Sequence, residues 1–379
     1  MTKNLKTYRT LGGWTEWPAG LQPQLDGHTN ADVVIIGAGF AGLCAALELA
    51  RHKVKVVVLE PDFAGSGASS RNAGYLAGAQ GLKYDRFLQR IDRDLLVNAM
   101  SILVCSEHEQ GLAQFLYWCA ICFGDWNAFK ENSGHWPIEG GTGRLINAIS
   151  AESRAELRLS TPVAAVDDNG REVMVTTRDG QRIRARHVVV ALPLIMLHEL
   201  SVTPPLPQPV RAMIEQKNPI MPSKIWVRVK GEIEPFVIYA PVGKHPINTA
   251  HAERRGNGDT LVVCFCCDTS ALDGNDREAV QRALRDFVPD IEVLDTVCQD
   301  WANDAFARGG WMHHRPGNLT QAAPLMRTPH GRIHFAGADK PGSVSAASTV
   351  PSRPARGPPS TSLAHWPWQV VDCDWLTPC

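Results

Sequence analysis

Residues 31–60 read Ala-Asp-Val-Val-Ile-Ile-Gly-Ala-Gly-Phe-Ala-Gly-Leu-Cys-Ala-Ala-Leu-Glu-Leu-Ala-Arg-His-Lys-Val-Lys-Val-Val-Val-Leu-Glu. An apolar run, a glycine turn, an amphipathic stretch and a second apolar run predict strand, turn, helix and strand in that order. A glycine triplet between an apolar strand and a helix is typical of the βαβ unit that binds a dinucleotide, and it is far more specific than a glycine triplet alone.

Each glycine of this triplet has its own predicted role. Gly37 lets the chain leave the strand in a tight turn, Gly39 lets the backbone approach a pyrophosphate, and Gly42 lets the helix lie close to the sheet. The predicted helix has Phe40 and Ala41 in its first turn, and it presents free N–H groups and the positive end of its dipole to the phosphates. We therefore predict that these five residues bind the cofactor.

The acid that ends the second strand narrows the choice of dinucleotide. Glu60 lies 23 residues after Gly37 and is placed to accept hydrogen bonds from a pair of ribose hydroxyls. Because an acid there disfavours a 2′-phosphate, NADP is the least favoured dinucleotide.

The composition of the 379 residues is that of a globular protein. With 44% hydrophobic residues, the chain can bury a large core and is long enough for two domains. A net charge of −1 gives no electrostatic reason to expect nucleic acid or an anionic membrane as partner, so small molecules are better candidates. No segment is apolar over the length that crosses a bilayer. We expect a cytoplasmic protein without a transmembrane segment, and a homodimer remains open as its assembly.

The ten cysteines do not indicate a disulfide scaffold in a chain of this length. Several lie inside apolar strands such as Leu261–Cys267. Cys119 and Cys122 have the spacing of a redox or metal pair, but no second pair or histidine motif lies near them. We expect buried, reduced thiols and no metal site.

The order of the remaining segments predicts one domain interrupted by another. A polar loop at 65–74 is expected near the cofactor, and residues 84–116 have helical periodicity. Asp179-Gly180 predicts a hairpin across 172–185, followed by a strand at 188–192 that is buried on both faces. The other expected elements are strands at 224–230, 236–240 and 260–267, a helix at 275–287, and a last core strand at 332–336 that returns to the first domain.

Four of these segments, together with the first stretch, resemble the flavin-dependent amine oxidase family. Gly140–Leu145 resembles the glycine turn before the second nucleotide-contact segment, and Thr161–Val163 resembles the strand whose valine backbone meets adenine. Val188–Pro193 resembles the buried strand that follows, and Arg332–Asp339 resembles the late segment that closes over the FAD diphosphate and ribityl chain. The resemblance implies an α/β fold in which an FAD-binding, Rossmann-like domain with a parallel sheet is interrupted by a mixed-sheet substrate domain.

The resulting domain map is discontinuous. The FAD-binding domain is expected to comprise residues 1–83, 137–195 and 318–345. The substrate domain is expected to comprise residues 84–136 and 196–317, and residues 346–379 are expected to be disordered or the product of a frameshift.

Two residues have catalytic roles by this resemblance. Lys224 looks like the family lysine that holds a water molecule against flavin N5 and aids reoxidation by oxygen. Trp311 looks like one wall of the aromatic pair that guides an amine to the flavin, since aromatic faces attract ammonium groups.

Further residues are implied in cofactor binding: Arg71, Val163, Gly337 and Asp339. Gly310 stands where covalent-flavin relatives have a cysteine, which implies that FAD is held non-covalently. The adjacent His313 and His314 have no third ligand in view, and we interpret them as structural or solvent-facing rather than metal ligands.

The implied reaction is hydride transfer from the carbon that bears a neutral amine to flavin N5, which gives an imine that water hydrolyses. Molecular oxygen then reoxidises the flavin and yields hydrogen peroxide. The cofactor carries the chemistry, and the protein positions the C–H bond and desolvates the amine.

Two departures leave alternatives open. The loop Gly67–Gly74 looks more like glycine and D-amino acid oxidases, so an amino-acid oxidase or dehydrogenase is the close alternative, with Arg71, Arg228 and Arg315 as candidate carboxylate ligands. The segment between residues 75 and 137 is also much shorter than in typical amine oxidases, which predicts an open pocket.

A third and larger departure follows Asp339. Residues 341–379 are rich in proline and lack the Gly-Gly-Phe-Asp-Gly-Ala-like helix start of the family. With GC-rich codons, Ser345–Pro354 read two bases later encodes this motif, so we hypothesise a frameshift upstream of Ser345, which the nucleotide sequence decides. If the tail is real, a catalytically silent FAD-binding protein is the third alternative.

Overall fold

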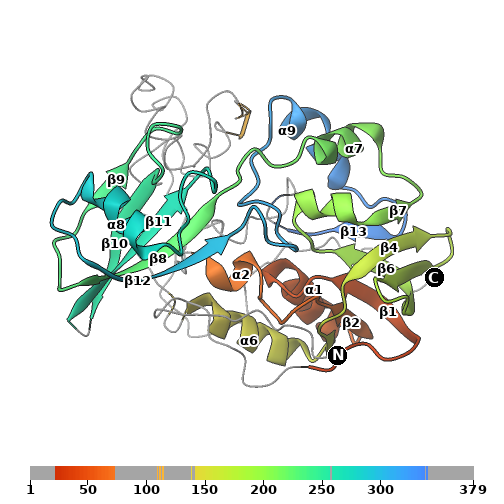
Figure 1. Ribbon diagram of the computed structural model, residues 1–379. Coiled ribbons are helices and arrows are strands. Elements are labelled where there is room, and N and C mark those ends of the chain that lie inside the picture. Colours follow the sequence, from red (N-terminus) through yellow and green to blue (C-terminus); the bar gives the residue numbers. More distant parts are fainter. Residues whose placement is uncertain are drawn as a thin grey trace, which may run out of the picture.

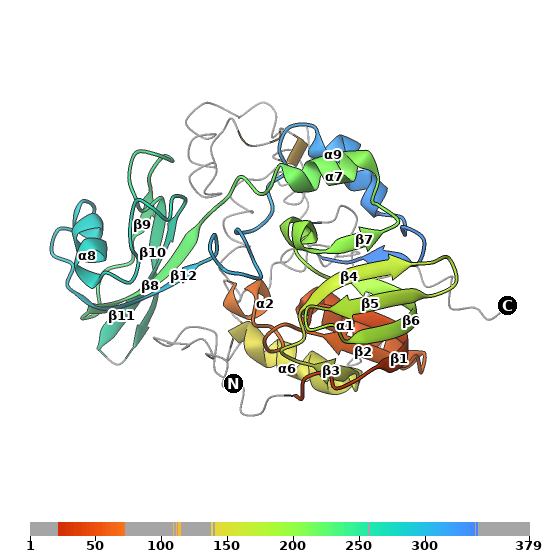
Figure 2. The same cartoon turned by 45° about the vertical axis from the view of Figure 1, so that its right-hand side comes forward.

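The computed structural model describes residues 22–72, 109, 111, 113–114, 138, 141–256, 258–337 and 339. These residues form two sheets, and the short helix α2 (Ala68–Arg71) lies between them in both views (Figure 1 and Figure 2). The α/β class with a parallel-containing sheet is therefore confirmed.

The larger sheet has eight strands and carries the glycine triplet. Strand β1 (Thr29–Ile36) is followed by α1 (Phe40–Arg51) and by β2 (Val56–Leu59), which pairs with β1 in parallel. The strand order is β3-β2-β1-β6-β5-β4-β7, with β13 paired to β6. The remaining strands are β3 (Glu156–Arg158), β4 (Val163–Asp168), β5 (Val173–Thr177), β6 (Arg182–Val190), β7 (Ser201–Thr203) and β13 (Ile333–Phe335).

Strand β6 joins the distant parts of this sheet. Along its whole length it pairs in parallel with β1, from Thr29↔Ile183 to Ile36↔Val190. On its other edge, its first half pairs antiparallel with β5, and its second half pairs in parallel with β13. The hairpin expected at 172–185 is thus formed by β5 and the first half of β6. The buried strand expected at 188–192 is the second half of the same strand.

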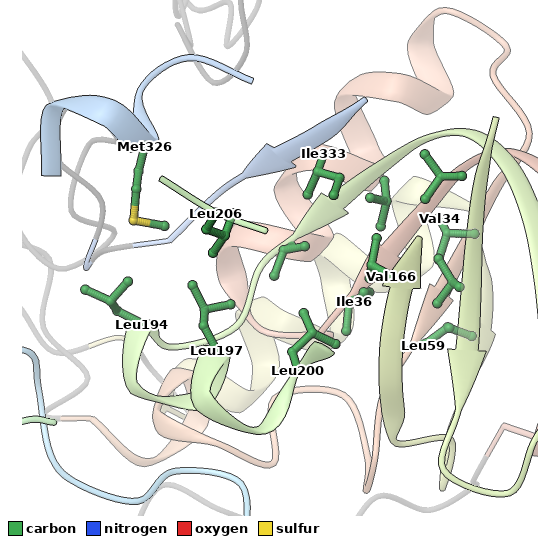
Figure 3. Packing of buried hydrophobic residues seen from close by; sticks show 14 of the residues in the cluster. Val34, Ile36, Leu59, Val166, Leu194, Leu197, Leu200, Leu206, Met326 and Ile333 are labelled. Atoms are coloured by element: carbon green, nitrogen blue, oxygen red, sulfur yellow. The ribbon is translucent and has the colours of Figure 1, made fainter. Parts of the chain in front are cut away.

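Apolar side chains cover both faces of the larger sheet. Val33 and Ile35 face a layer with α1 and with α6 (Gly141–Ser153), whereas Val34 and Ile36 face the opposite layer. Figure 3 shows Val34 and Ile36 in that second layer. Residues 33–36 of β1 are buried on both faces, which explains their continuous apolar run.

The second layer is covered by the 3₁₀-helix at Leu194–Glu199 and by α7 (Gln208–Glu215). Strand β7 pairs with β4 of the same sheet. The segment 194–215 therefore packs on the larger sheet, although the sequence-based boundary placed residues from 196 onward in the substrate domain. The short helices α9 (Asn318–Gln321) and Ala323–Met326 add to the same layer.

The smaller sheet has five strands in the order β12-β8-β11-β10-β9, and all of its pairs are antiparallel. Its strands are β8 (Ser223–Lys230), β9 (Val237–Tyr239), β10 (Thr249–Gly256), β11 (Asp259–Cys266) and β12 (Val293–Asp300). Helix α8 (Arg277–Arg285) packs on the face that carries Ile225, Val227 and Val229. Figure 2 shows α8 on the side of this sheet that is turned away from the larger sheet.

The strands expected at 224–230, 236–240 and 260–267 are confirmed as β8, β9 and β11, and the helix expected at 275–287 as α8. The expected last strand is β13. The loop expected at 65–74 contains the short helix α2. The helix expected at 84–116, the pair Cys119 and Cys122, and the tail after Asp339 lie outside the described residues, apart from four positions between 109 and 114.

We expect the N-cap of α8 to contribute measurably to the stability of the smaller domain. One carboxylate oxygen of Asp276 accepts hydrogen bonds from the backbone N–H groups of Glu278 and Ala279, both at 3.0 Å. Asp276→Ala should lower the free energy of unfolding by about 1 kcal/mol in denaturant titrations. Asp276→Asn, which keeps the acceptor, is the matched control and should stay close to wild type. Equal losses in both variants would contradict a capping role.

Candidate functional site

The turn between β1 and α1 is built by close backbone approach. Gly37 has φ +103°, and a Cβ there would lie 3.0 Å from the carbonyl oxygen of Ala191 at the end of β6. A Cβ on Gly42 would lie 2.0 Å from the carbonyl oxygen of Gly37 and 3.1 Å from the side chain of Ile35. Only glycine fits at these positions, so α1 begins directly over the end of β1.

The first turn of α1 carries a feature that the sequence did not reveal. The backbone N–H of Phe40 donates a hydrogen bond to the hydroxyl of Ser69 in α2, at 3.0 Å. A Cβ on Gly39 would lie 2.8 Å from the same hydroxyl oxygen. Ser69 therefore adds a hydroxyl to the N–H groups at the helix start, where Ala41 and Gly42 follow, and this combination suits a phosphate. Its only sequence signal was its place in the polar loop.

Glu60 lies at the end of β2 with its side chain turned toward the glycine turn. Its carboxylate accepts hydrogen bonds from the backbone N–H of Ala38 at 2.8 Å, the backbone N–H of Asp62 at 3.2 Å and the hydroxyl of Ser66 at 3.2 Å. Burial raises the pKa of Glu60 to about 7, although these hydrogen bonds oppose the rise. Glu60 thus joins the turn to the loop before α2.

Lys224 is the second residue of β8, and its side chain is buried against the larger domain. Its ammonium donates a hydrogen bond to the carbonyl oxygen of Arg71, the last residue of α2, at 3.3 Å. Only 6% of Lys224 is exposed, and this burial lowers the pKa of its amine to about 8. The contact places a cationic group of the smaller sheet beside the loop that follows the dinucleotide turn.

Two aromatic rings lie beside this lysine, and a third ring lies against one of them. The Lys224 ammonium is 4.9 Å from the ring centre of Trp226 and 5.6 Å from that of Phe265, distances at which an aromatic face attracts a cation. Phe265 is the direct cross-strand neighbour of Lys224 on β11. The ring of Trp311 meets Phe265 edge to face, with 5.8 Å between centroids. The structure therefore brings Lys224 and Trp311 together through Phe265, which the sequence analysis did not single out.

The two adjacent histidines are both buried, so the solvent-facing option is wrong for them. His313 is 0% exposed, and its Nε2 accepts a hydrogen bond from the indole N–H of Trp311 at 3.1 Å. Burial lowers the pKa of His313 to about 3, so its ring is a neutral acceptor at neutral pH. Burial also lowers the pKa of His314. His313 thereby fixes the orientation of the Trp311 ring.

The other residues predicted in cofactor binding lie at the ends of strands of the larger sheet. Val163 begins β4, two residues after Thr161, whose N–H bonds the carbonyl oxygen of Glu60 at 2.9 Å. Gly337 follows β13 with φ +136°. The carboxylate of Asp339 accepts a hydrogen bond from the backbone N–H of Leu194 at 2.7 Å, which ties the segment after β13 to the start of the 3₁₀-helix at Leu194–Glu199.

The three candidate arginines differ in their surroundings. The Arg71 guanidinium lies 5.7 Å from the ring centre of Trp301. Arg228 is nearly half exposed and lies 4.0 Å from the carboxylate of Asp259, and Arg315 is paired with Glu109. Of the three, Arg71 is the one whose backbone contacts Lys224.

The residues of the larger sheet fit a bound FAD. The glycine positions leave space that any Cβ would fill, and the first turn of α1 contains no acidic residue that would repel phosphates. Among the described residues, no group of three or more His, Cys, Asp or Glu side chains could hold a metal ion. No described helix is long and apolar enough to cross a membrane.

The fold and the site together define a flavoprotein, and the chain belongs to the flavin containing amine oxidoreductase family, whose model matches residues 76–347. A second family model, an FAD binding domain, matches residues 32–109, and FAD is the cofactor.

Among curated relatives, the chain is 30% identical to the pseudooxynicotine dehydrogenase of a Pseudomonas species over 229 residues, 60% of this chain and 46% of that protein. It is 33% identical to (S)-6-hydroxynicotine oxidase of Paenarthrobacter nicotinovorans over 199 residues, 52% of this chain and 46% of that protein. The chain thus spans about half the length of these relatives.

Solved structures share the fold. A triple mutant of putrescine oxidase matches with a TM-score of 0.64 at 16% identity, over 82% of this chain and 94% of that chain. Cyclohexylamine oxidase from Brevibacterium oxydans IH-35A matches with a TM-score of 0.56 at 15% identity, over 82% of this chain and 93% of that chain.

We expect the spacing between α1 and β1 to control FAD binding. Gly42→Ala places a methyl group within 2.0 Å of a backbone oxygen, so α1 must shift, which costs about 1–3 kcal/mol of stability and displaces its N-terminal N–H groups. The purified variant should retain less than about one tenth of the flavin absorbance per chain and should melt at a lower temperature.

The matched control is Gly67→Ala. A Cβ at Gly67 meets no atom within 4 Å, and its φ of −84° suits alanine. This variant should bind FAD like the wild type. Normal FAD content in Gly42→Ala would contradict the role assigned to the close approach.

Proposed function

We propose that this protein oxidises an amine to an imine, which water then hydrolyses. The observation that carries the proposal is the buried ammonium of Lys224, flanked by aromatic rings and 3.3 Å from the carbonyl oxygen of Arg71 in α2, the helix whose Ser69 contacts the start of α1. Bound FAD, held non-covalently, supplies the hydride acceptor at its N5, with molecular oxygen as final oxidant and hydrogen peroxide as product.

Lys224 acts in this proposal as a fixed cation in a water-poor environment. Its pKa of about 8 keeps it protonated at pH 7, where it holds a water molecule and stabilises negative charge that develops near it. The Arg71 carbonyl and the ring of Trp226 limit its positions, so little reorganisation is needed.

Phe265 and Trp311 are proposed to form the apolar walls that the substrate passes. Their rings attract an ammonium group on approach, and their apolar surface favours release of its proton and water. The hydrogen bond from Trp311 to His313 holds one wall in place, so the C–H bond to be broken meets a defined surface.

An amino-acid oxidase remains the second candidate because of Arg71. Its guanidinium lies over Trp301, and its backbone contacts Lys224, so a substrate carboxylate bound by Arg71 would lie close to the lysine.

Anaerobic mixing of the yellow protein with amines and with D- and L-amino acids tests these functions. We expect amines to bleach the absorbance near 450 nm and amino acids to leave it unchanged. Bleaching by amino acids alone would favour the second candidate. A colourless protein that gains no such absorbance with added FAD would support a catalytically silent chain and refute the proposal.

We expect the charge of Lys224 to set the pH dependence of flavin reduction at saturating amine. Because the pKa is about 8, the cation is present below pH 8 and is lost above it, and the limiting rate should fall there. Lys224→Arg, which keeps its charge, should not show this fall, and Lys224→Met should be slower by about tenfold or more at pH 7. Stopped-flow absorbance measures the rates, and an unchanged inflection in both variants would assign it to another group.

A further inference from the structure

Trp311 lies in a segment of buried residues that belongs to none of the described strands. The three residues that follow it are buried, and Trp311 itself is half-buried. Buried backbone N–H and C=O groups need hydrogen-bond partners, which a strand finds on its neighbours. In residues 310–314 the side-chain amides of Asn218 and Gln114 take the place of such neighbours.

The side chain of Asn218 forms four hydrogen bonds with backbone groups, which is the full capacity of an amide. Its Nδ2 donates to the carbonyl oxygens of Gly310 at 3.1 Å and Trp311 at 3.0 Å. Its Oδ1 accepts from the N–H groups of Ile220 at 3.1 Å and His313 at 3.3 Å. Only 3% of Asn218 is exposed, so loss of the amide leaves several buried backbone groups without this partner.

Gln114 holds the other side of the same segment. Its Nε2 donates to the carbonyl oxygen of Met312 at 2.9 Å, and its Oε1 accepts from the backbone N–H of His314. Successive residues of an extended chain direct their polar backbone groups to opposite sides, so Asn218 and Gln114 contact opposite sides of the segment. The position of the segment therefore depends on two side chains rather than on a ladder of strand pairs.

Asn218 also begins the segment that leads to Lys224. The five residues that start with Asn218 run directly into β8, whose second residue is Lys224. This segment packs on the glycines before Trp311, because a Cβ on Gly310 would lie 2.6 Å from the ring of Pro222. The segment that positions the lysine and the segment that positions the tryptophan are thus in direct contact, and the Asn218 amide joins them.

We propose that Asn218 is a positioning residue, which holds Trp311 in a fixed place relative to Phe265 and Lys224 and thereby determines how tightly an amine binds. This inference rests on the proposed amine oxidation, in which Trp311 forms one wall of the substrate passage. Asn218 acts through the backbone of Trp311, whose indole is held in turn by His313. A wall that keeps its place stabilises the bound amine and the transition state alike, so its displacement weakens binding more than it slows flavin reduction.

Stopped-flow reduction of the FAD-loaded protein by an amine that it oxidises tests this role in turnover. We expect Asn218→Ala to raise the apparent dissociation constant of the amine by about tenfold and to change the limiting rate of reduction by less than about threefold. Asn218→Ser keeps a hydroxyl, should give a smaller rise, and takes the place of the alanine variant if that variant does not fold. In a Trp311→Ala background, Asn218→Ala should add less than about twofold, because the two residues act as one.

The place of the Trp311 ring can also be followed without turnover. In the FAD-loaded protein labelled with fluorinated tryptophan, fluorine NMR resolves the tryptophan signals, and Trp311→Phe identifies the signal of Trp311. We expect Asn218→Ala to shift or broaden this signal and to leave most of the others in place. The control is Gln281→Ala, because the Gln281 side chain also binds backbone, the N–H of Val293 at 2.8 Å, but belongs to α8. This control should change neither the Trp311 signal nor amine binding.

Three results would overturn this inference while amine oxidation stands. The first is an unchanged Trp311 signal in Asn218→Ala. The second is the full tenfold weakening of amine binding in the Trp311→Ala background, since Asn218 would then act without Trp311. The third is a slower limiting rate with unchanged binding, which would assign Asn218 to the reaction step or to the fold. No flavin reduction by any amine would refute the proposed function itself, and the fluorine signal would still test whether Asn218 positions Trp311.

Discussion

The start of α1 packs on the backbone that ends β1 with no space between them for a side chain at Gly42. Any side chain at Gly42 would overlap the carbonyl oxygen of Gly37. The carbonyl oxygen of Ala191, which follows the neighbouring strand β6, packs against Gly37 from the other side. The turn is therefore held by main-chain packing from two sides. This packing fixes the position of the N–H groups at the start of α1. The backbone alone therefore determines where these groups can bind a phosphate.

A single hydrogen bond extends this geometry to the smaller sheet. The carbonyl oxygen of Arg71 belongs to α2, which also carries the Ser69 hydroxyl at the start of α1, and it accepts from Lys224 on β8. The helix α2 thus contacts the start of α1 through Ser69 and contacts Lys224 through Arg71. A buried ammonium needs an acceptor, so the burial of Lys224 favours the arrangement in which the carbonyl oxygen of Arg71 meets it.

The sequence predicted the parts in which local pattern and fold agree. The β1–α1–β2 unit was readable because its strands are apolar on both faces and its glycines have no alternative. Strand β10 was missed because it carries the polar residues His251 and Glu253, and its bulge breaks the alternation by which strands are recognised.

The site was predicted only in part, for a similar reason. Lys224 and Trp311 were predicted from a family resemblance. Phe265 was not predicted, because it lies beside Lys224 only through the pairing of β8 with β11, and the sequence of one strand does not show how two strands pair. His313 and His314 looked polar in the sequence, and their burial follows from tertiary packing, with a hydrogen bond from Trp311 as compensation for His313.

The pairing of β6 also determines the order in which this chain can fold as it is synthesised. The smaller sheet draws all of its strands from residues 223–300, so it can close while the chain is still growing. The larger sheet must wait: β1 needs β6, about 150 residues later, and β6 needs β13, about 150 residues later again. During that interval the apolar edge of β6 stays open, which makes the larger domain the part most in need of protection from aggregation at the ribosome.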